Sequence, residues 1–188
     1  VADAATRART VLVYNIMNRP SGEHINNSLE PLRLSYQEGI ERGDIQYCAY
    51  ASGAYSMHLL LSGKNLQWVK HEMIRYNQPP RALSRDFPTF ENNPLIQVAS
   101  NLLGENDDIT RLSGQYFEEK SDCSASLAQK DRLRMFICFA YKMFLAYLAE
   151  RYEEALEFGR MAVTYDDNVK GGIFEPFYAF YLGMANIA

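Results

Sequence analysis

The clearest pattern in the chain is a pair of apolar stripes on either side of a four-residue break at 149–152. Apolar residues recur every three or four positions from Leu133 to Leu148, and again from Tyr152 to Val163. This spacing is typical of a helix with one buried face. Because so short a break leaves room only for antiparallel packing, we predict a helical hairpin over 130–163.

The same spacing predicts helices along most of the chain. Residues 1–18 favour a helix through their Ala and Arg content, although Val11 to Tyr14 also fits a strand. We predict further helices over Ser28 to Gly43, 44–62, Leu66 to Tyr76, Asn93 to Leu102, Ile109 to Phe117 and from about Phe174, with loops at 19–27, 79–92 and 166–172 and a polar connection at 121–129.

Small and polar residues mark the expected corners between these helices. Ser28 is a candidate cap with Pro31 in the first turn after it. Gly43 followed by Asp44 predicts a helix end directly before a new helix start. Gly39, in the middle of a predicted helix, implies close approach of a neighbouring helix, because glycine otherwise weakens a helix by roughly 1 kcal/mol. The 44–62 segment has two apolar faces, which predicts packing from both sides.

Small and aromatic residues recur at spacings of three and four in several helices, as in tetratricopeptide repeats. Examples start at Gly43, Gly63 and Arg151. No complete repeat period is present, so an irregular helical domain is the alternative. We predict an all-α fold, with antiparallel helical hairpins stacked as a tetratricopeptide-like array (an α-solenoid fragment) in a single domain over 1–188. The uncapped ends suggest a piece excised from a longer chain.

Composition narrows the classes of partner. The net charge is −4 over 188 residues, and Lys and Arg never cluster beyond two adjacent positions. This argues against nucleic-acid binding and against a polybasic membrane patch. The longest nearly apolar run, Met135 to Leu148, is interrupted by Lys142 and is shorter than the roughly 20 residues of a membrane span.

The three cysteines, Cys48, Cys123 and Cys138, are odd in number and widely spaced. Two of them lie in apolar helical stretches. We expect all three to be reduced and buried, in a cytoplasmic protein.

Motifs that would support chemistry are incomplete. Gly63-Lys64 resembles the end of a phosphate-binding loop, but His58 stands where the first glycine is needed and Asn65 replaces the Ser or Thr. We therefore interpret Gly63 as a helix stop. Asp166-Asp167-Asn168 has no second acidic motif and is interpreted as a turn.

The histidines also lack a partner pattern for metal binding. His24, His58 and His71 have no second histidine four positions away, and His71-Glu72 is interpreted as a solvated pair. No catalytic, cofactor-binding or metal-binding residue is assigned, no cofactor is expected, and the chain is not expected to be an enzyme by itself.

The block 29–66, LEPLRLSYQEGIERGDIQYCAYASGAYSMHLLLSGKNL, resembles the helical region of large multidomain signalling proteins. In that family, a serine/threonine-kinase-like domain and a predicted AAA/STAND-type ATPase precede a tetratricopeptide-like segment, and sensor and histidine-kinase domains follow. Residues 112–120, 139–155 and 174–185 are similar as well, so the resemblance covers nearly the whole chain. The kinase and nucleotide-binding motifs of the family are absent here and are carried to no residue.

The resemblance implies a non-catalytic protein-interaction or regulatory segment of a multidomain cytosolic signalling kinase. The expected partners are another protein or neighbouring domains of the same chain, with self-association through the exposed 174–188 helix, and with neither nucleic acid nor membrane insertion. The alternative is a small-molecule effector sensor with an aromatic-lined pocket between helices.

Overall fold

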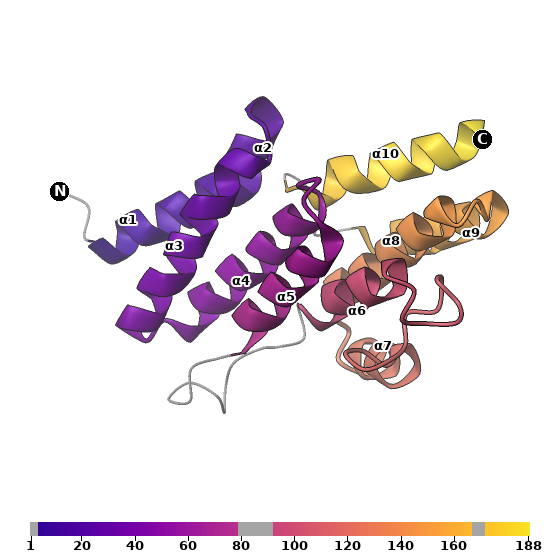
Figure 1. Ribbon diagram of the computed structural model, residues 1–188, viewed down its shortest axis with the longest axis horizontal. Helices are drawn as coiled ribbons and strands as arrows, with labels where there is room; N and C mark the ends of the chain where they lie inside the picture. Colours follow the sequence, from indigo (N-terminus) through magenta and orange to yellow (C-terminus); the bar gives the residue numbers. More distant parts are fainter. Residues whose placement is uncertain (1–3, 79–91, 167–171) are drawn as a thin grey trace. The chain divides into compact units, whose positions relative to one another are not determined.

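The computed structural model describes residues 4–78, 92–166 and 172–188, and the regular elements among them are all helices, which confirms the all-α class (Figure 1). The chain divides into two compact units, residues 1–99 and 100–188. The elements are α1 (Ala4–Val13), the π-helix η1 (Tyr14–Asn18), α2 (Arg19–Gly22), α3 (Asn26–Arg42), α4 (Ile45–Leu60), α5 (Leu66–Asn77), α6 (Asn93–Leu102), α7 (Glu119–Ala128), α8 (Arg132–Leu148), α9 (Tyr152–Val163) and α10 (Phe174–Ile187).

The first unit is built around α4. This helix packs against α3 on one side and α5 on the other, and α1 packs against α3. Tyr76 of α5 makes edge-to-face contacts with Tyr36 of α3 and Tyr55 of α4, with ring centroids 5.0 and 4.9 Å apart. The prediction of a helix covered from both sides is therefore confirmed for α4.

The corner between α3 and α4 follows the predicted chemistry. Gly43 adopts a left-handed φ of 68°, and its N–H and that of Asp44 bond back to the carbonyls of Ile40 and Gly39. The Asp44 carboxylate then accepts the N–H of Tyr47 and caps α4. Helix reversal takes only two residues, which forces α3 and α4 close together at their joined ends.

The second unit is built around the α8–α9 hairpin, which confirms the opening prediction. α10 packs against both of these helices, and α7 packs against α8. The core of α8, α9 and α10 uses small residues, Ala146, Ala155 and Ala185, beside Met143. Small side chains allow the three helix axes to approach closely.

Two segments differ from the prediction in the second unit. The predicted helix from Ile109 to Phe117 is instead an irregular loop with an isolated antiparallel bridge between Ser113 and Glu118. The carboxylate of Asp108 accepts both the N–H and the hydroxyl of Thr110, and the Asn106 amide donates to the carbonyls of Arg111 and Ser113. These side chains satisfy backbone groups that a helix would have used.

The other difference is the predicted polar connection at 121–129, where helix α7 runs to Ala128. It carries few apolar residues, so periodicity did not reveal it. Its acidic first turn and its Ala, Lys and Leu content favour a helix.

The start of α3 also differs from the prediction. Residues 19–22, predicted as loop, form α2, and α3 begins at Asn26. Ser28 is therefore buried inside the first turn and caps nothing, and Pro31 lies within the helix. Pro31 has no N–H to offer the carbonyl of Asn27 four residues earlier, and that carbonyl instead accepts from Arg19 Nη1 at 3.0 Å. The stacked tetratricopeptide-like arrangement stays a prediction.

Substitution of Gly39 by Ala tests the tight corner. An added Cβ would lie 2.7 Å from Cys48 Sγ and 3.3 Å from the Cys48 backbone nitrogen. We expect Gly39→Ala to lower the free energy of unfolding by roughly 1–2 kcal/mol in urea denaturation, since overpacking exceeds the gain in helix propensity.

Gly183→Ala is the matched control, because an added Cβ there meets no atom within 4 Å. It should stabilise by up to about 1 kcal/mol. Adding Cys48→Ala to Gly39→Ala should recover part of the loss, and equal destabilisation by both glycine substitutions would contradict the close-approach interpretation.

Candidate functional site

One side of α10 is apolar and faces solvent. Phe180 is 58% exposed and Ile187 is 79% exposed. Positions in line with them on the helix are also exposed, and together they span an arc of roughly 100° at the helical rotation per residue. We define the outer face of α10 as Pro176, Ala179, Phe180, Gly183 and Ile187.

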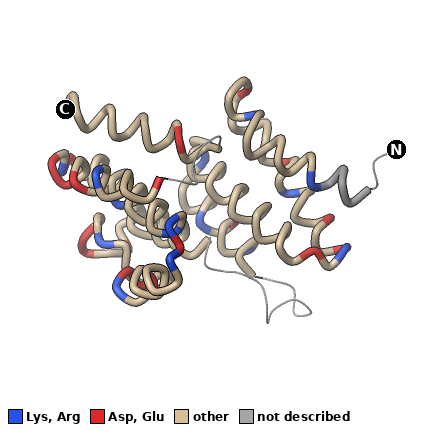
Figure 2. The backbone as a smooth tube through the Cα atoms, turned by 180° about the vertical axis from the view of Figure 1, so that it is seen from behind, with Lys and Arg blue, Asp and Glu red and all other residues tan. Residues whose placement is uncertain are grey.

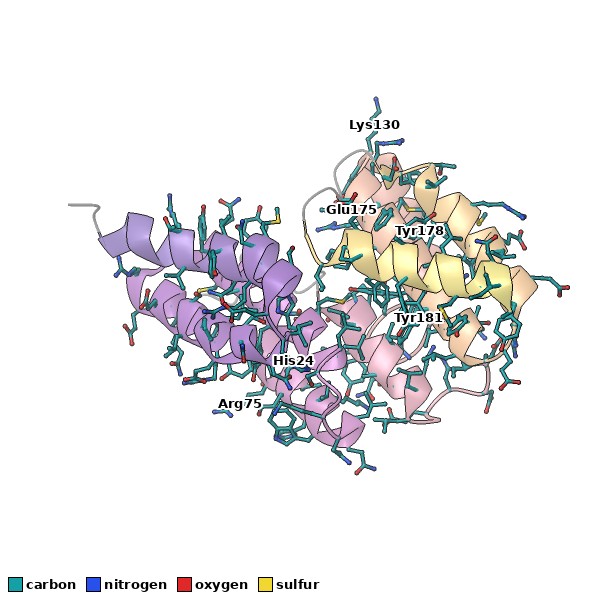
Figure 3. The ribbon with its side chains drawn as sticks, turned by 90° about the horizontal axis from the view of Figure 1, so that it is seen from above. His24, Arg75, Lys130, Glu175, Tyr178 and Tyr181 are labelled. Atoms are coloured by element: carbon teal, nitrogen blue, oxygen red, sulfur yellow. The ribbon has the colours of Figure 1, made fainter. Side chains whose placement is uncertain are left out.

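The opposite side of α10 is held rigidly by its own unit. Phe177 and Ala185 are buried, and Tyr181 contacts Phe144 with ring centroids 4.8 Å apart. The Tyr178 hydroxyl donates to the carbonyl of Gly159 at 2.9 Å. Figure 3 labels Tyr178 and Tyr181 where they leave this helix. The outer face is therefore presented on an element whose orientation within the second unit is fixed by aromatic packing.

Charge is almost absent from α10. Its sequence, FEPFYAFYLGMANI, contains Glu175 as the only charged residue. Figure 2 shows this single acidic position near the start of the helix and neutral residues after it. A helix with neutral residues on both sides resembles one that is covered from both sides, as α4 is.

Gly183 gives the outer face a distinct shape. An added Cβ at Gly183 meets nothing within 4 Å, whereas one at Gly159 would lie 2.6 Å from Leu182 Cδ1. Gly159 of α9 is therefore the point at which a leucine from α10 packs closely. Gly183 presents a similar small-residue gap, between Phe180 and Ile187, with no helix of the structure closely packed on it.

The first unit contains a hollow between α1, α3 and the start of α4. It contains about 300 Å³ of unfilled space, part of it open to solvent. Arg9 spans it, bonded to Asp44 at 2.9 Å and lying over the Tyr47 ring at 4.5 Å. Tyr47 is the one aromatic residue in the lining of this hollow, beside the charged Arg9, Arg42 and Asp44, so it is not an aromatic-lined pocket of the predicted kind. Its lining is Arg9, Leu12, Ser35, Gly39, Arg42, Asp44 and Tyr47.

The residues that resembled a phosphate-binding loop form a helix stop, as predicted. Gly63 has a φ of 73°, between α4 and α5. The Asn65 side chain accepts the N–H of Trp68 and caps α5. Of Asp166-Asp167-Asn168, the last two positions lie outside the described residues.

The three histidines are not brought together. His24 and His71 are exposed, and the backbone N–H of Asn26 donates to the His24 ring at 3.2 Å. Glu72 corrects the prediction of a solvated pair, because it is buried and its carboxylate contacts the Tyr55 hydroxyl at 3.5 Å and Arg75 at 3.4 Å. No group of three or more His, Cys, Asp or Glu within 4–78, 92–166 and 172–188 is arranged to hold a metal ion.

His58 is fully buried between α4 and α3. The Ser28 hydroxyl donates to the carbonyl of Ile25 at 2.6 Å, so the contact between Ser28 and His58 Nδ1 requires the ring to donate from Nδ1. His58 Nε2 is then an acceptor without a partner in the structure. Burial lowers the pKa of His58 to about 4, because a charged ring would carry an unpaired N–H in the core.

Within the part of the chain that the structure covers, every helix is too short or too polar to cross a bilayer. Of the residues that the motifs drew attention to, Gly63 and Asn65 lie at helix ends, and His58 packs in the core. The outer face of α10 was not assigned residue by residue from the sequence. The signal that could have found it is the apolar line through Phe180 and Ile187 on a helix whose other side is apolar too.

The buried state of His58 predicts a loss of stability on acidification. Unfolded His58 titrates near 6.5, so between that pH and about 4 the unfolded chain binds a proton that the folded chain does not. Stability is complete above pH 6.5 and falls as the pH falls. Urea denaturation at pH 7.5 and pH 5 should differ by about 2 kcal/mol from this group.

His58→Gln should remove that difference, whereas the matched variant of an exposed ring, His71→Gln, should keep it. An unchanged pH dependence in His58→Gln would show that the neutral buried ring is not its source.

Comparison with protein-family models, with curated proteins and with solved structures finds no significant match to this chain.

Proposed function

We propose that this chain is a non-catalytic protein-interaction segment, and that the outer face of α10 is the surface that receives a partner. The observation that carries the proposal is an uncharged, exposed line of residues on a rigidly held helix, with Gly183 at its centre. Burial of such an apolar face on binding is favourable, because it removes apolar surface from water.

The occupant that fits is an amphipathic helix with a branched aliphatic side chain at its contact point. At two points, the molecule already packs a side chain of one helix onto a glycine of the neighbouring helix. Cys48 of α4 packs against Gly39 of α3, and Leu182 of α10 packs against Gly159 of α9. A third contact at Gly183 would extend the same packing by one helix, as helical repeats do.

A regulatory role accords with the resemblance to multidomain signalling kinases. In that setting, the partner helix belongs to another protein or to a neighbouring domain of the same cytosolic chain. Binding at α10 would then favour one arrangement of the domains over another, which requires only that the face is covered in one arrangement and not in the other.

Self-association of the isolated chain tests the surface. Without another partner, the outer face of α10 should pair with the same face of a second copy, since that is the apolar surface then available to cover it. We expect light scattering to show a molar mass that rises with concentration into the high micromolar range. Gly183→Leu should abolish the rise by filling the gap, while the monomer fold is retained because the added atoms point into open space.

Phe180→Glu should have the same effect as Gly183→Leu. Leu127→Glu is the matched control, because Leu127 is 52% exposed but lies on α7. Hydrogen exchange should show concentration-dependent protection confined to α10. A wild-type chain that stays monomeric, or association that Leu127→Glu removes and Gly183→Leu does not, would contradict the assignment.

A further inference from the structure

The α7–α8 hairpin sets two cysteines opposite each other. Residues 129–131 join the antiparallel helices, so positions equally far from the turn face one another. Lys142 and Glu119 form an ion pair across the helices, although Glu119 lies one residue closer to Lys130 of the turn than Lys142 does. Cys123 is four residues after Glu119 and Cys138 is four residues before Lys142. The next facing pair along the hairpin is therefore Cys123 with Cys138.

An interaction between the two side chains agrees with this register. The Cys138 thiol hydrogen bonds to the sulfur of Cys123. Cys138 is buried as expected, whereas Cys123 is partly exposed, which corrects the expectation that all three cysteines are buried. Lys130, labelled in Figure 3, lies at the turn that closes this hairpin. Cys48 belongs to the first unit, where its thiol points at the carbonyl of Tyr36 at 3.6 Å.

We propose that Cys123 and Cys138 form a peroxide-sensitive dithiol, in which Cys123 reacts first and Cys138 resolves the product to a disulfide that ties α7 to α8. The two thiols interact, and facing positions on packed helices, as the Glu119–Lys142 pair shows, bring the two Cβ atoms close, as a disulfide requires. Partial exposure gives a peroxide access to Cys123, whereas Cys138 is reached only by its neighbour.

The chemistry is complete with one hydroperoxide. The Cys123 thiolate attacks the peroxide oxygen, the O–O bond breaks, and Cys123 becomes a sulfenic acid while an alcohol, or water from hydrogen peroxide, leaves. The Cys138 sulfur then attacks the Cys123 sulfur, the S–O bond breaks, and water leaves with the Cys138 proton. The two thiols lose two electrons in total, and the peroxide gains them. A cellular dithiol reductant would reverse the reaction by thiol–disulfide exchange.

Electrostatics give the two sulfurs different roles. The hydrogen bond from Cys138 lowers the pKa of Cys123, assisted by the Lys142 ammonium and opposed by burial and by the nearby carboxylates. The same hydrogen bond, together with burial, raises the pKa of Cys138. The thiolate needed for the first step is thus favoured at the accessible sulfur.

Peptide mapping of the whole chain tests the assignment. The protein is treated with a small excess of hydrogen peroxide, and its free thiols are then alkylated. Apart from the mass of the alkyl groups, the intact protein should be lighter by about 2 Da, because each of the two thiols loses one hydrogen. Trypsin should release residues 121–130 joined to residues 135–142, and a reductant should separate them. Of the three cysteines, only Cys48 should remain open to alkylation once the oxidised chain is unfolded.

Variants separate the two roles. Cys138→Ser should leave a sulfenic acid on Cys123 that dimedone traps, and Cys123→Ser should abolish both products. Cys48→Ala is the matched control and should form the disulfide as the wild type does. Circular dichroism shows whether each variant folds. The wild-type peptide map tests the disulfide even if a variant does not fold. Three alkylated thiols after peroxide, a link to Cys48, or sulfinic acid on Cys123 without a cross-link would each overturn the proposal.

Discussion

Close approach of antiparallel helices at a glycine is the contact on which both units depend. At Gly39 the thiol of Cys48 occupies the space that a Cβ would need, and at Gly159 the end of Leu182 does so. In each case the missing side chain lets a neighbouring helix pack deeply and bury its apolar face. The intrinsic weakness of glycine in a helix is offset by this tertiary packing, which explains why both glycines lie within a helix and not beyond its end.

The part of the fold that could be predicted from the sequence is the pairing of consecutive helices. A short corner is determined by residues close together in sequence, so the α3–α4 and α8–α9 pairs followed from apolar spacing and from residues such as Gly43 and Asp44. The loop at 109–117 could not be predicted this way, because its backbone groups bond to Asn106 and to Asp108. α7 could not be found by apolar spacing either, since much of its surface is polar and exposed.

The candidate site shows a different limit of sequence reasoning. Apolar spacing indicates that α10 is buried on some side, but it does not say which of two apolar sides is covered. Only the structure separates Phe177, which packs on α8, from Phe180, which faces solvent. Likewise, His58 appears in the sequence as one polar residue in an apolar helix. That the proton lies on Nδ1, so that the unpartnered Nε2 is an acceptor, follows from the bond that Ser28 makes to Ile25.

The corners of the two units differ in a way that bears on how the molecule folds. The corner after α3 places a glycine in the left-handed conformation, whereas those after α7 and α8 place Lys130 and Glu150 there, with φ of 57° and 59°. A residue with a Cβ enters this conformation at a cost of roughly 1–2 kcal/mol. The first corner can therefore close early by local preference alone. The corners on either side of α8 carry this cost, which the packing of α7, α8 and α9 offsets, so we expect these corners to form together with that packing.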